Sequence, residues 1–102
     1  MIITEVAQKK IAELILISQE AMPDYKLFLR ITAMLDDNSK LKHQTYFDYE
    51  IREDDLVVSY PGFDLRIDKL SLPYLDGATV DYLESNGTVE FIINNPNQEW
   101  YF

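Results

Sequence analysis

The chain has 102 residues, the length of one folded domain, and it contains no cysteine. The absence of cysteine excludes disulfides and any metal or cluster site built from thiolates of these residues. Its 18 acidic and 9 basic residues give a net charge of −9, so DNA, RNA and anionic membranes are poor partners. We expect one domain over residues 1–102, in a cytoplasmic protein without a membrane-spanning segment.

The N-terminal part of the chain predicts an amphipathic helix over residues 4–22. Thr4 is a suitable N-cap, and Pro23 ends the helical pattern. Between them, apolar residues recur at spacings of three and four, which is the pattern of a helix with one buried face. These residues are Ala7, Ile11, Leu14 and Ile15.

After this helix the apolar period changes from 3.6 to two, the period of a strand. Residues 27–33 alternate as a strand covered on one side does. Residues 34–42 are polar and patternless, and we interpret them as a loop. Alternation resumes over residues 43–51, and the acidic run at 53–55 is typical of a solvated turn.

The second half of the chain predicts two hairpins separated by a short helical turn. The four strands cover residues 56–60, 63–67, 78–84 and 88–93. Pro-Gly at 61–62 and Asn-Gly at 86–87 are the turn signals of the two hairpins. Asp68 is a suitable cap for a helical turn over residues 69–75.

These elements predict a mainly β fold. One helix precedes about six short strands, and no helix separates successive strands as parallel crossovers would require. The pattern therefore favours a β-sandwich or a mixed two-sheet fold with one covering helix.

Several short motifs stand in a distinctive order. They are Ile2-Ile3-Thr4, Ala7, Lys10-Ile11, Ser71-Leu72-Pro73-Tyr74-Leu75-Asp76-Gly77, Asp81-Tyr82, Phe91 and Asn95-Pro96-Asn97. Their order and spacing resemble the HesB/IscA/SufA family of A-type iron–sulfur carriers over nearly the whole chain. The resemblance implies a HesB-like two-sheet mixed β-sandwich with one N-terminal helix and one short helical turn. It also implies dimers or tetramers that carry clusters or iron during iron–sulfur assembly.

The chain departs from this family at the positions of its cysteine ligands. Counting without gaps places Asn38 where the family has a cysteine in a glycine-rich loop. The family also has a Cys-Gly-Cys tail, and the present sequence reaches Phe102 about where the first of these cysteines begins. Clusters require soft, anionic sulfur donors, which an asparagine amide does not replace. We therefore expect no bound cofactor on these residues.

Oxygen ligands offer an alternative metal site. If the two segments meet as the family resemblance implies, Asp36, Asp37 and Glu99 would present carboxylates to a hard cation such as iron. The competing interpretation is an ordinary solvated acidic loop. The single histidine, His43, is interpreted as a structural strand residue.

Three consecutive aromatic residues end the sequence, at Trp100, Tyr101 and Phe102. Exposed aromatic side chains reduce solubility, so we expect them to fold back over the site where the family's cysteine tail would sit or to pack against a second subunit. A frayed chain end is the alternative interpretation.

The sequence therefore favours an accessory or regulatory protein of iron–sulfur cluster biogenesis. It would act through contacts with iron–sulfur assembly proteins, as a homo-oligomer and not as an enzyme. One alternative is an iron or other metal-binding protein that uses oxygen ligands. A second alternative is a ligand-binding module or enzyme that reuses the scaffold, because a fold does not determine a function.

Overall fold

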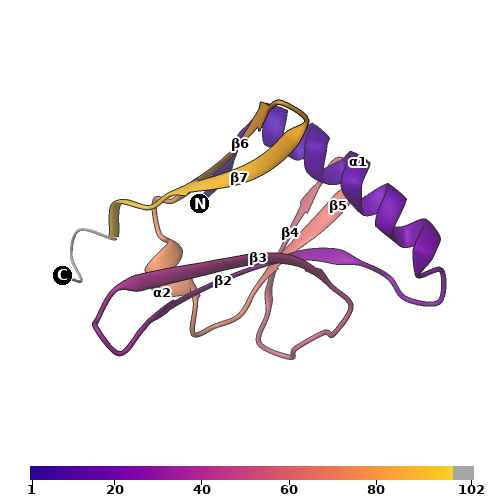
Figure 1. Ribbon diagram of the computed structural model, residues 1–102. Coiled ribbons are helices and arrows are strands. Elements are labelled where there is room, and N and C mark those ends of the chain that lie inside the picture. The colour runs from indigo at the N-terminus through magenta and orange to yellow at the C-terminus, as the bar shows by residue number, and fades with distance from the viewer. Residues whose placement is uncertain (98–102) are drawn as a thin grey trace.

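The structure is a computed structural model that describes residues 1–97. Within these residues, seven strands and two helices follow one another (Figure 1). They are β1 (Ile2–Ile3), α1 (Glu5–Ala21), β2 (Phe28–Leu35), β3 (Leu41–Asp48), β4 (Leu56–Tyr60), β5 (Phe63–Ile67), α2 (Leu72–Leu75), β6 (Thr79–Ser85) and β7 (Thr88–Asn94). No helix within the described part of the chain is long and apolar enough to cross a membrane.

The strands form two mixed sheets. One sheet has the order β1-β6-β7 and the other has the order β3-β2-β5-β4. In each sheet one pair is parallel, β1 with β6 and β2 with β5, and the other pairs are antiparallel. The mainly β, two-sheet fold with one long helix and one short helical turn is therefore confirmed. The parallel pairs join strands that are far apart in the sequence, so no crossover helix between successive strands is needed.

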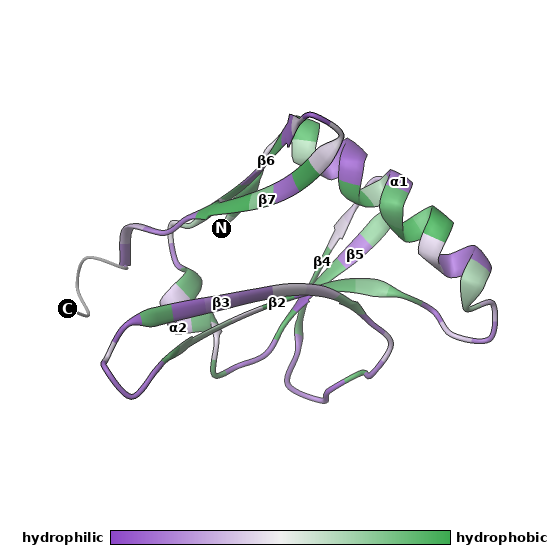
Figure 2. Cartoon of the chain, in the orientation of Figure 1, coloured by the Kyte–Doolittle hydropathy of each residue, from purple (hydrophilic) through white to green (hydrophobic). Residues whose placement is uncertain are grey.

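The hydrophobic core lies between α1 and the inner faces of the two sheets. Thr4 caps α1, because its hydroxyl accepts a hydrogen bond from the amide of Ala7. The hydrophobic segments of both sheets are green in Figure 2. Each fully buried aliphatic side chain contributes about 1.5–3 kcal/mol to folding. The most deeply buried ones are Ile11, Leu29, Ile31, Leu65, Leu75 and Val80.

The two predicted hairpin turns are confirmed and have the backbone that their residues favour. Asn86 and Gly87 both have positive φ, at 53° and 80°, as a two-residue hairpin turn requires. Gly62 has φ 88°, and a Cβ added there would lie 2.9 Å from the Cβ of Ala12. The absence of a side chain at Gly62 therefore allows the β4–β5 hairpin to pack directly on α1.

The loop predicted over residues 34–42 is shorter in the structure. Strand β2 continues to Leu35 and β3 already begins at Leu41, where the two residues are paired. Leu41 at this end of β3 is buried and contributes to the core. Strand pairing therefore extends nearly to the tip of the β2–β3 hairpin. At its other end β3 stops at Asp48, earlier than the prediction of residue 51.

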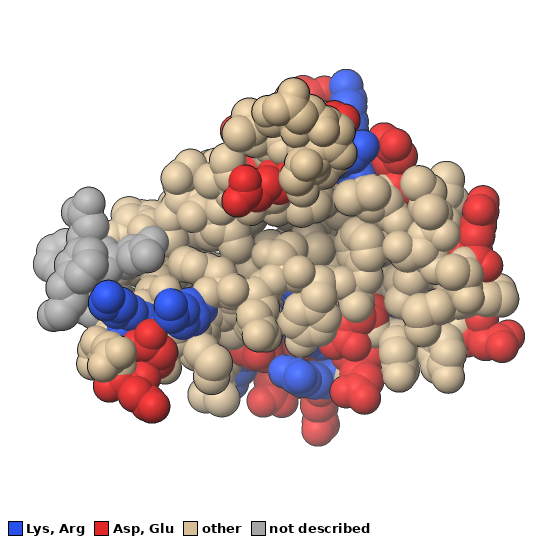
Figure 3. Space-filling model, in the orientation of Figure 1, with Lys and Arg blue, Asp and Glu red and all other residues tan. Residues whose placement is uncertain are grey.

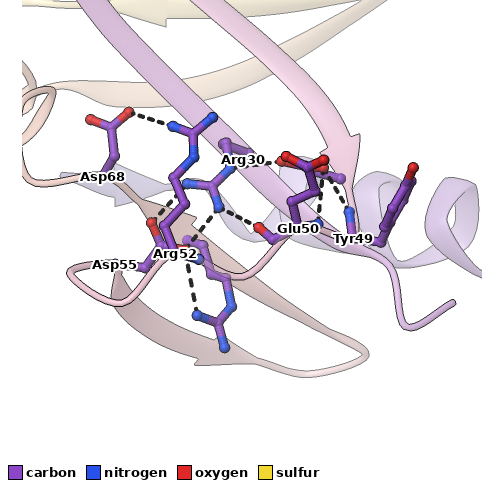
Figure 4. Close-up of polar contacts among 8 residues, drawn as sticks. Arg30, Tyr49, Glu50, Arg52, Asp55 and Asp68 are labelled. Carbon is purple, nitrogen blue, oxygen red and sulfur yellow. Dashed lines mark hydrogen bonds and ion pairs between the residues drawn. The ribbon is translucent and has the colours of Figure 1, made fainter.

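A buried arginine lies on the outer face of the four-stranded sheet. Arg30 of β2 is fully buried, and its guanidinium donates hydrogen bonds to the carboxylates of Asp48 and Asp55 and to the carbonyl of Glu50, at 2.8–2.9 Å (Figure 4). Each of these hydrogen bonds ends on a carboxylate or carbonyl oxygen. Such pairing offsets the large cost of removing a charge from water.

Asp55 corrects the interpretation of the 53–55 run as a solvated turn. Its neighbours are exposed, but the Asp55 side chain is fully buried. It also accepts hydrogen bonds from the backbone amide of Arg52 and from the guanidinium of Arg66 on β5. The hydrogen bond from Arg30 is the main cause that lowers the pKa of Asp55 to about 2.

This cluster holds the connection between the two edge strands of the sheet. Residues 49–55 leave β3 at one edge and enter β4 at the other, so they must cross the two central strands. Arg30 and Arg66 stand on those central strands; Arg30 holds the segment near both of its ends, and Arg66 holds it at Asp55. The guanidinium carbon of each arginine also lies 5.2 Å from the centroid of the Phe28 ring.

The Asp55→Asn variant tests this ion pair through pH. Because the pKa of Asp55 is lower in the folded state than its ordinary value of 3.8, the ionised carboxylate stabilises the fold at pH values above 3.8. This contribution is lost as the pH falls towards about 2. The shift corresponds to about 2 kcal/mol, and removal of the anion costs about 3–5 kcal/mol because Arg30 stays buried. Urea unfolding across this pH range should therefore show a lower and flatter profile for the variant.

The matched control is Asp54→Asn, which removes the same negative charge from an exposed neighbouring residue. We expect it to change the free energy of unfolding by less than about 0.5 kcal/mol. Equal losses in the two variants would contradict the buried ion pair.

Candidate functional site

The first part of the candidate site is the turn at residues 36–40, which joins β2 to β3. The Asp36 carboxylate accepts hydrogen bonds from the backbone amides of Asn38 and Lys40, at 2.8 and 3.0 Å. Ser39 has φ 59°, a left-handed conformation that closes the turn. The hydrogen bond from the Lys40 amide is the main cause that lowers the pKa of Asp36. Asp36 therefore closes the turn with its own side chain.

The remaining predicted site residues divide between this turn and the part of the chain outside the structural description. Asp37 and Asn38 are exposed at the tip of the turn. Within residues 1–97 no group of three or more His, Cys, Asp or Glu side chains is placed to hold a metal ion. The other predicted residues, Glu99, Trp100, Tyr101 and Phe102, lie outside the described residues. The oxygen-ligand site therefore stays a prediction.

The second part of the site is the turn at residues 95–97, which follows β7. Asn95 is buried, and its amide nitrogen donates to the carbonyl of Tyr74 and faces the Nε2 of His43 at 3.0 Å. The amide nitrogen of Asn97 donates to the carbonyl of Asp76 at 2.6 Å. These carbonyls stand at the C-terminal end of α2, where a helix has no internal donors left. The two asparagines thereby fasten the end of β7 to α2.

Two neighbouring residues complete this attachment. Gly77 has φ 76°, and a Cβ there would lie 3.3 Å from the Cγ of Pro96, so the 95–97 turn packs against the backbone just after α2. His43, on β3, accepts the hydrogen bond from Asn95 when its Nε2 is unprotonated. Its burial lowers its pKa, which favours this neutral form. The expectation that His43 is a structural residue agrees with this contact.

The 36–40 and 95–97 turns lie at the same end of the molecule (Figure 1). The contact between His43 and Asn95 joins the first residues of β3, just after the one turn, to the other turn. The groups at this end that could ligate a metal ion are carboxylate and amide oxygens and one imidazole. Asp36 is already engaged by two amides and by Lys42 at 3.9 Å, so it is held in place by the fold.

Sequence reasoning identified these segments but not how they are joined. The Asn-Pro-Asn motif was recognised as a family feature, whereas its hydrogen bonds to α2 depend on the fold. The alternating pattern of residues 27–33 places Arg30 on the side of the strand opposite Leu29 and Ile31, but it does not indicate partners that lie 18 to 25 positions away along the chain. A charged residue in the middle of a strongly apolar strand was the available signal for a buried ion pair.

Comparison with known proteins identifies the family. The family model described as iron-sulphur cluster biosynthesis matches residues 1–99. The chain belongs to this family. The iron-sulfur cluster insertion protein ErpA of Buchnera aphidicola subsp. Acyrthosiphon pisum (strain Tuc7) is 40% identical over 94 residues, which are 92% of this chain and 79% of that relative. The resemblance to HesB/IscA/SufA proteins is therefore confirmed.

Two solved structures have the same fold as this chain. SufA of Escherichia coli, described as involved in biosynthesis of iron-sulfur clusters, has a TM-score of 0.71 at 20% identity, over 93% of this chain and 79% of that one. IscA, solved with a 2Fe-2S cluster, has a TM-score of 0.65 at 23% identity, over 95% and 84%. At these identities the similarity establishes the fold alone.

The attachment of the 95–97 turn can be tested with Asn95→Ala. The substitution leaves the Tyr74 carbonyl without this donor and removes the contact with His43, so we expect a loss of about 1–3 kcal/mol in the free energy of unfolding. Asn94→Ala is the matched control, because Asn94 is an exposed neighbour of the same type. Urea unfolding measures both, and a loss no larger than that of the control would contradict the attachment.

Proposed function

We propose that this protein is an accessory or regulatory member of the iron-sulphur cluster biosynthesis family that acts through contacts with assembly proteins. In this proposal it is not an enzyme and it binds no cluster on residues 1–102. The observation that carries the proposal is the position of Asn38. It stands exposed on the turn where the family resemblance places a thiolate, in a sequence without cysteine.

The residues at this turn do not fit a cluster. Iron–sulfur clusters are held by anionic sulfur, with imidazole as the occasional substitute. The Asn38 amide is neutral, and the Asp36 carboxylate is engaged by the backbone of its own turn. A 2Fe-2S cluster, which the solved IscA holds, would therefore find no thiolate among the 102 residues.

Family membership and surface charge support a role in protein contacts. The ErpA relative is named as an iron–sulfur cluster insertion protein, which favours the same pathway for this chain. The net charge of −9 disfavours nucleic acids and anionic membranes as partners, and acidic side chains are prominent on the face in Figure 3. A cytoplasmic, homo-oligomeric protein that binds other proteins of iron–sulfur assembly is consistent with these properties.

Affinity capture from native lysate tests this proposal. The full chain carries a tag, and bound proteins are quantified by mass spectrometry against an unrelated acidic bait of similar net charge. We expect cysteine desulfurase or scaffold proteins of iron–sulfur assembly to be enriched at least about tenfold over the control bait. Proteins that bind only through charge should bind both baits equally, so enrichment indicates recognition of the surface of this protein. Enrichment of neither class would contradict the proposal.

Iron titration tests the alternative of an oxygen-ligand metal site. We expect no stoichiometric binding of ferrous or ferric iron. Stoichiometric binding that is lost in Asp37→Asn and in the double variant Asp36→Ala with Asp37→Ala, and kept in the exposed control Asp24→Asn, would favour the metal-binding alternative.

A further inference from the structure

Two strands, β3 and β7, stand at the ends of their sheets. Among the described residues, β7 pairs only with β6 and β3 pairs only with β2. Each therefore has one side along which its backbone amides and carbonyls make no ladder hydrogen bonds. Free edges of this kind are the positions at which a further strand can join a sheet.

The two edge strands border the same hollow. A cleft of about 480 Å³ is lined by residues of both strands, and Figure 3 shows the molecule hollowed between its two layers. In Figure 1 the ribbon of β7 passes above that of β3. The lining residues are His43, Thr45, Val89, Glu90, Phe91 and Ile93.

Strand β7 carries only one of the features that commonly protect a sheet edge, the exposed charge of Glu90. Natural edge strands are commonly very short, interrupted by bulges, or marked by charged residues, especially lysine, or by proline. β7 has seven residues, contains neither lysine nor proline, and pairs with β6 without interruption from Thr88 to Asn94. Its free side is therefore a regular template about 24 Å long.

The two faces of β7 define the chemistry of an added strand. Val89, Phe91 and Ile93 are half-buried on one face, so the residues beside them should be apolar. Glu90 lies on the other face together with Asp81, which stands opposite Ile92, and the β6–β7 hairpin contains no lysine or arginine between positions 79 and 94. Residues beside that face should therefore be basic.

We propose that the free edge of β7 binds an extended segment of a partner protein in which apolar and basic residues alternate. The segment adds to the β1-β6-β7 sheet as a further strand. Its apolar side chains cover the cleft face of β7, and its basic side chains lie beside Glu90. This inference rests on the sheet edge and the charge pattern, and it holds whether or not the partner belongs to iron–sulfur assembly.

A synthetic peptide tests the proposal on the full chain. The probe is a fluorescent, end-capped heptapeptide of alternating lysine and valine. Two controls are the glutamate–valine peptide and a lysine–valine peptide that is N-methylated at two adjacent central residues, so that neither of its backbone edges can pair. Fluorescence anisotropy near physiological salt should show binding that is at least about tenfold weaker for each control, because each removes either the charge or the strand pairing.

A charge-matched pair of variants locates the contact. Glu90→Gln should weaken the lysine–valine peptide several-fold, whereas Glu20→Gln changes the net charge equally on exposed α1 and should leave binding unchanged. Hydrogen exchange should show that the peptide protects alternate amides of β7.

Three results would overturn the proposal. They are equal binding of the N-methylated peptide, protection confined to other elements, and a dimer of the chain that protects the same amides and excludes the peptide. The last result would assign this edge to a second copy. None of these outcomes alters the reading of the lysate capture experiment, so failure of the two proposals can be distinguished.

Discussion

The buried Arg30 cation determines how the four-stranded sheet is completed. A guanidinium with no exposure to water requires oxygen acceptors, and the fold supplies them from Asp48, Glu50 and Asp55. Those acceptors flank the segment that runs from one edge strand to the other. The ion pairs therefore fix the path of residues 49–55 across the sheet, and with it the order β3-β2-β5-β4. Arg66 on the neighbouring central strand strengthens the same attachment.

The other end of the fold is held mainly by hydrogen bonds between side chains and backbone groups. Asn95 and Asn97 satisfy carbonyls at the end of α2, and Asp36 satisfies two amides of its own turn. This end of the molecule is where members of the HesB/IscA/SufA family place their thiolates, according to the sequence resemblance. In this chain the polar groups there are largely engaged in holding the backbone, which is consistent with a scaffold that binds other proteins.

Local signals in the sequence predicted most of the fold. Pro-Gly and Asn-Gly set two hairpins, and Thr4 set the start of α1, because each acts on a backbone within three residues. The partners of Arg30 could not be predicted, because ion pairing across 25 positions depends on the completed sheet. For the same reason Asp55 was interpreted as solvated. At the candidate site, the exposed turn around Asn38 was predicted, and the contact between His43 and Asn95 was not.

The central claim is that this protein keeps the fold of its family and binds no iron–sulfur cluster through its own residues. Iron and acid-labile sulfide measured per polypeptide, in protein purified anaerobically from its native cells, test this claim most directly. The account predicts far less than one iron and one sulfide per chain. Near-stoichiometric iron and sulfide, in brown protein whose colour is traced to a centre ligated by residues of this chain, would contradict it.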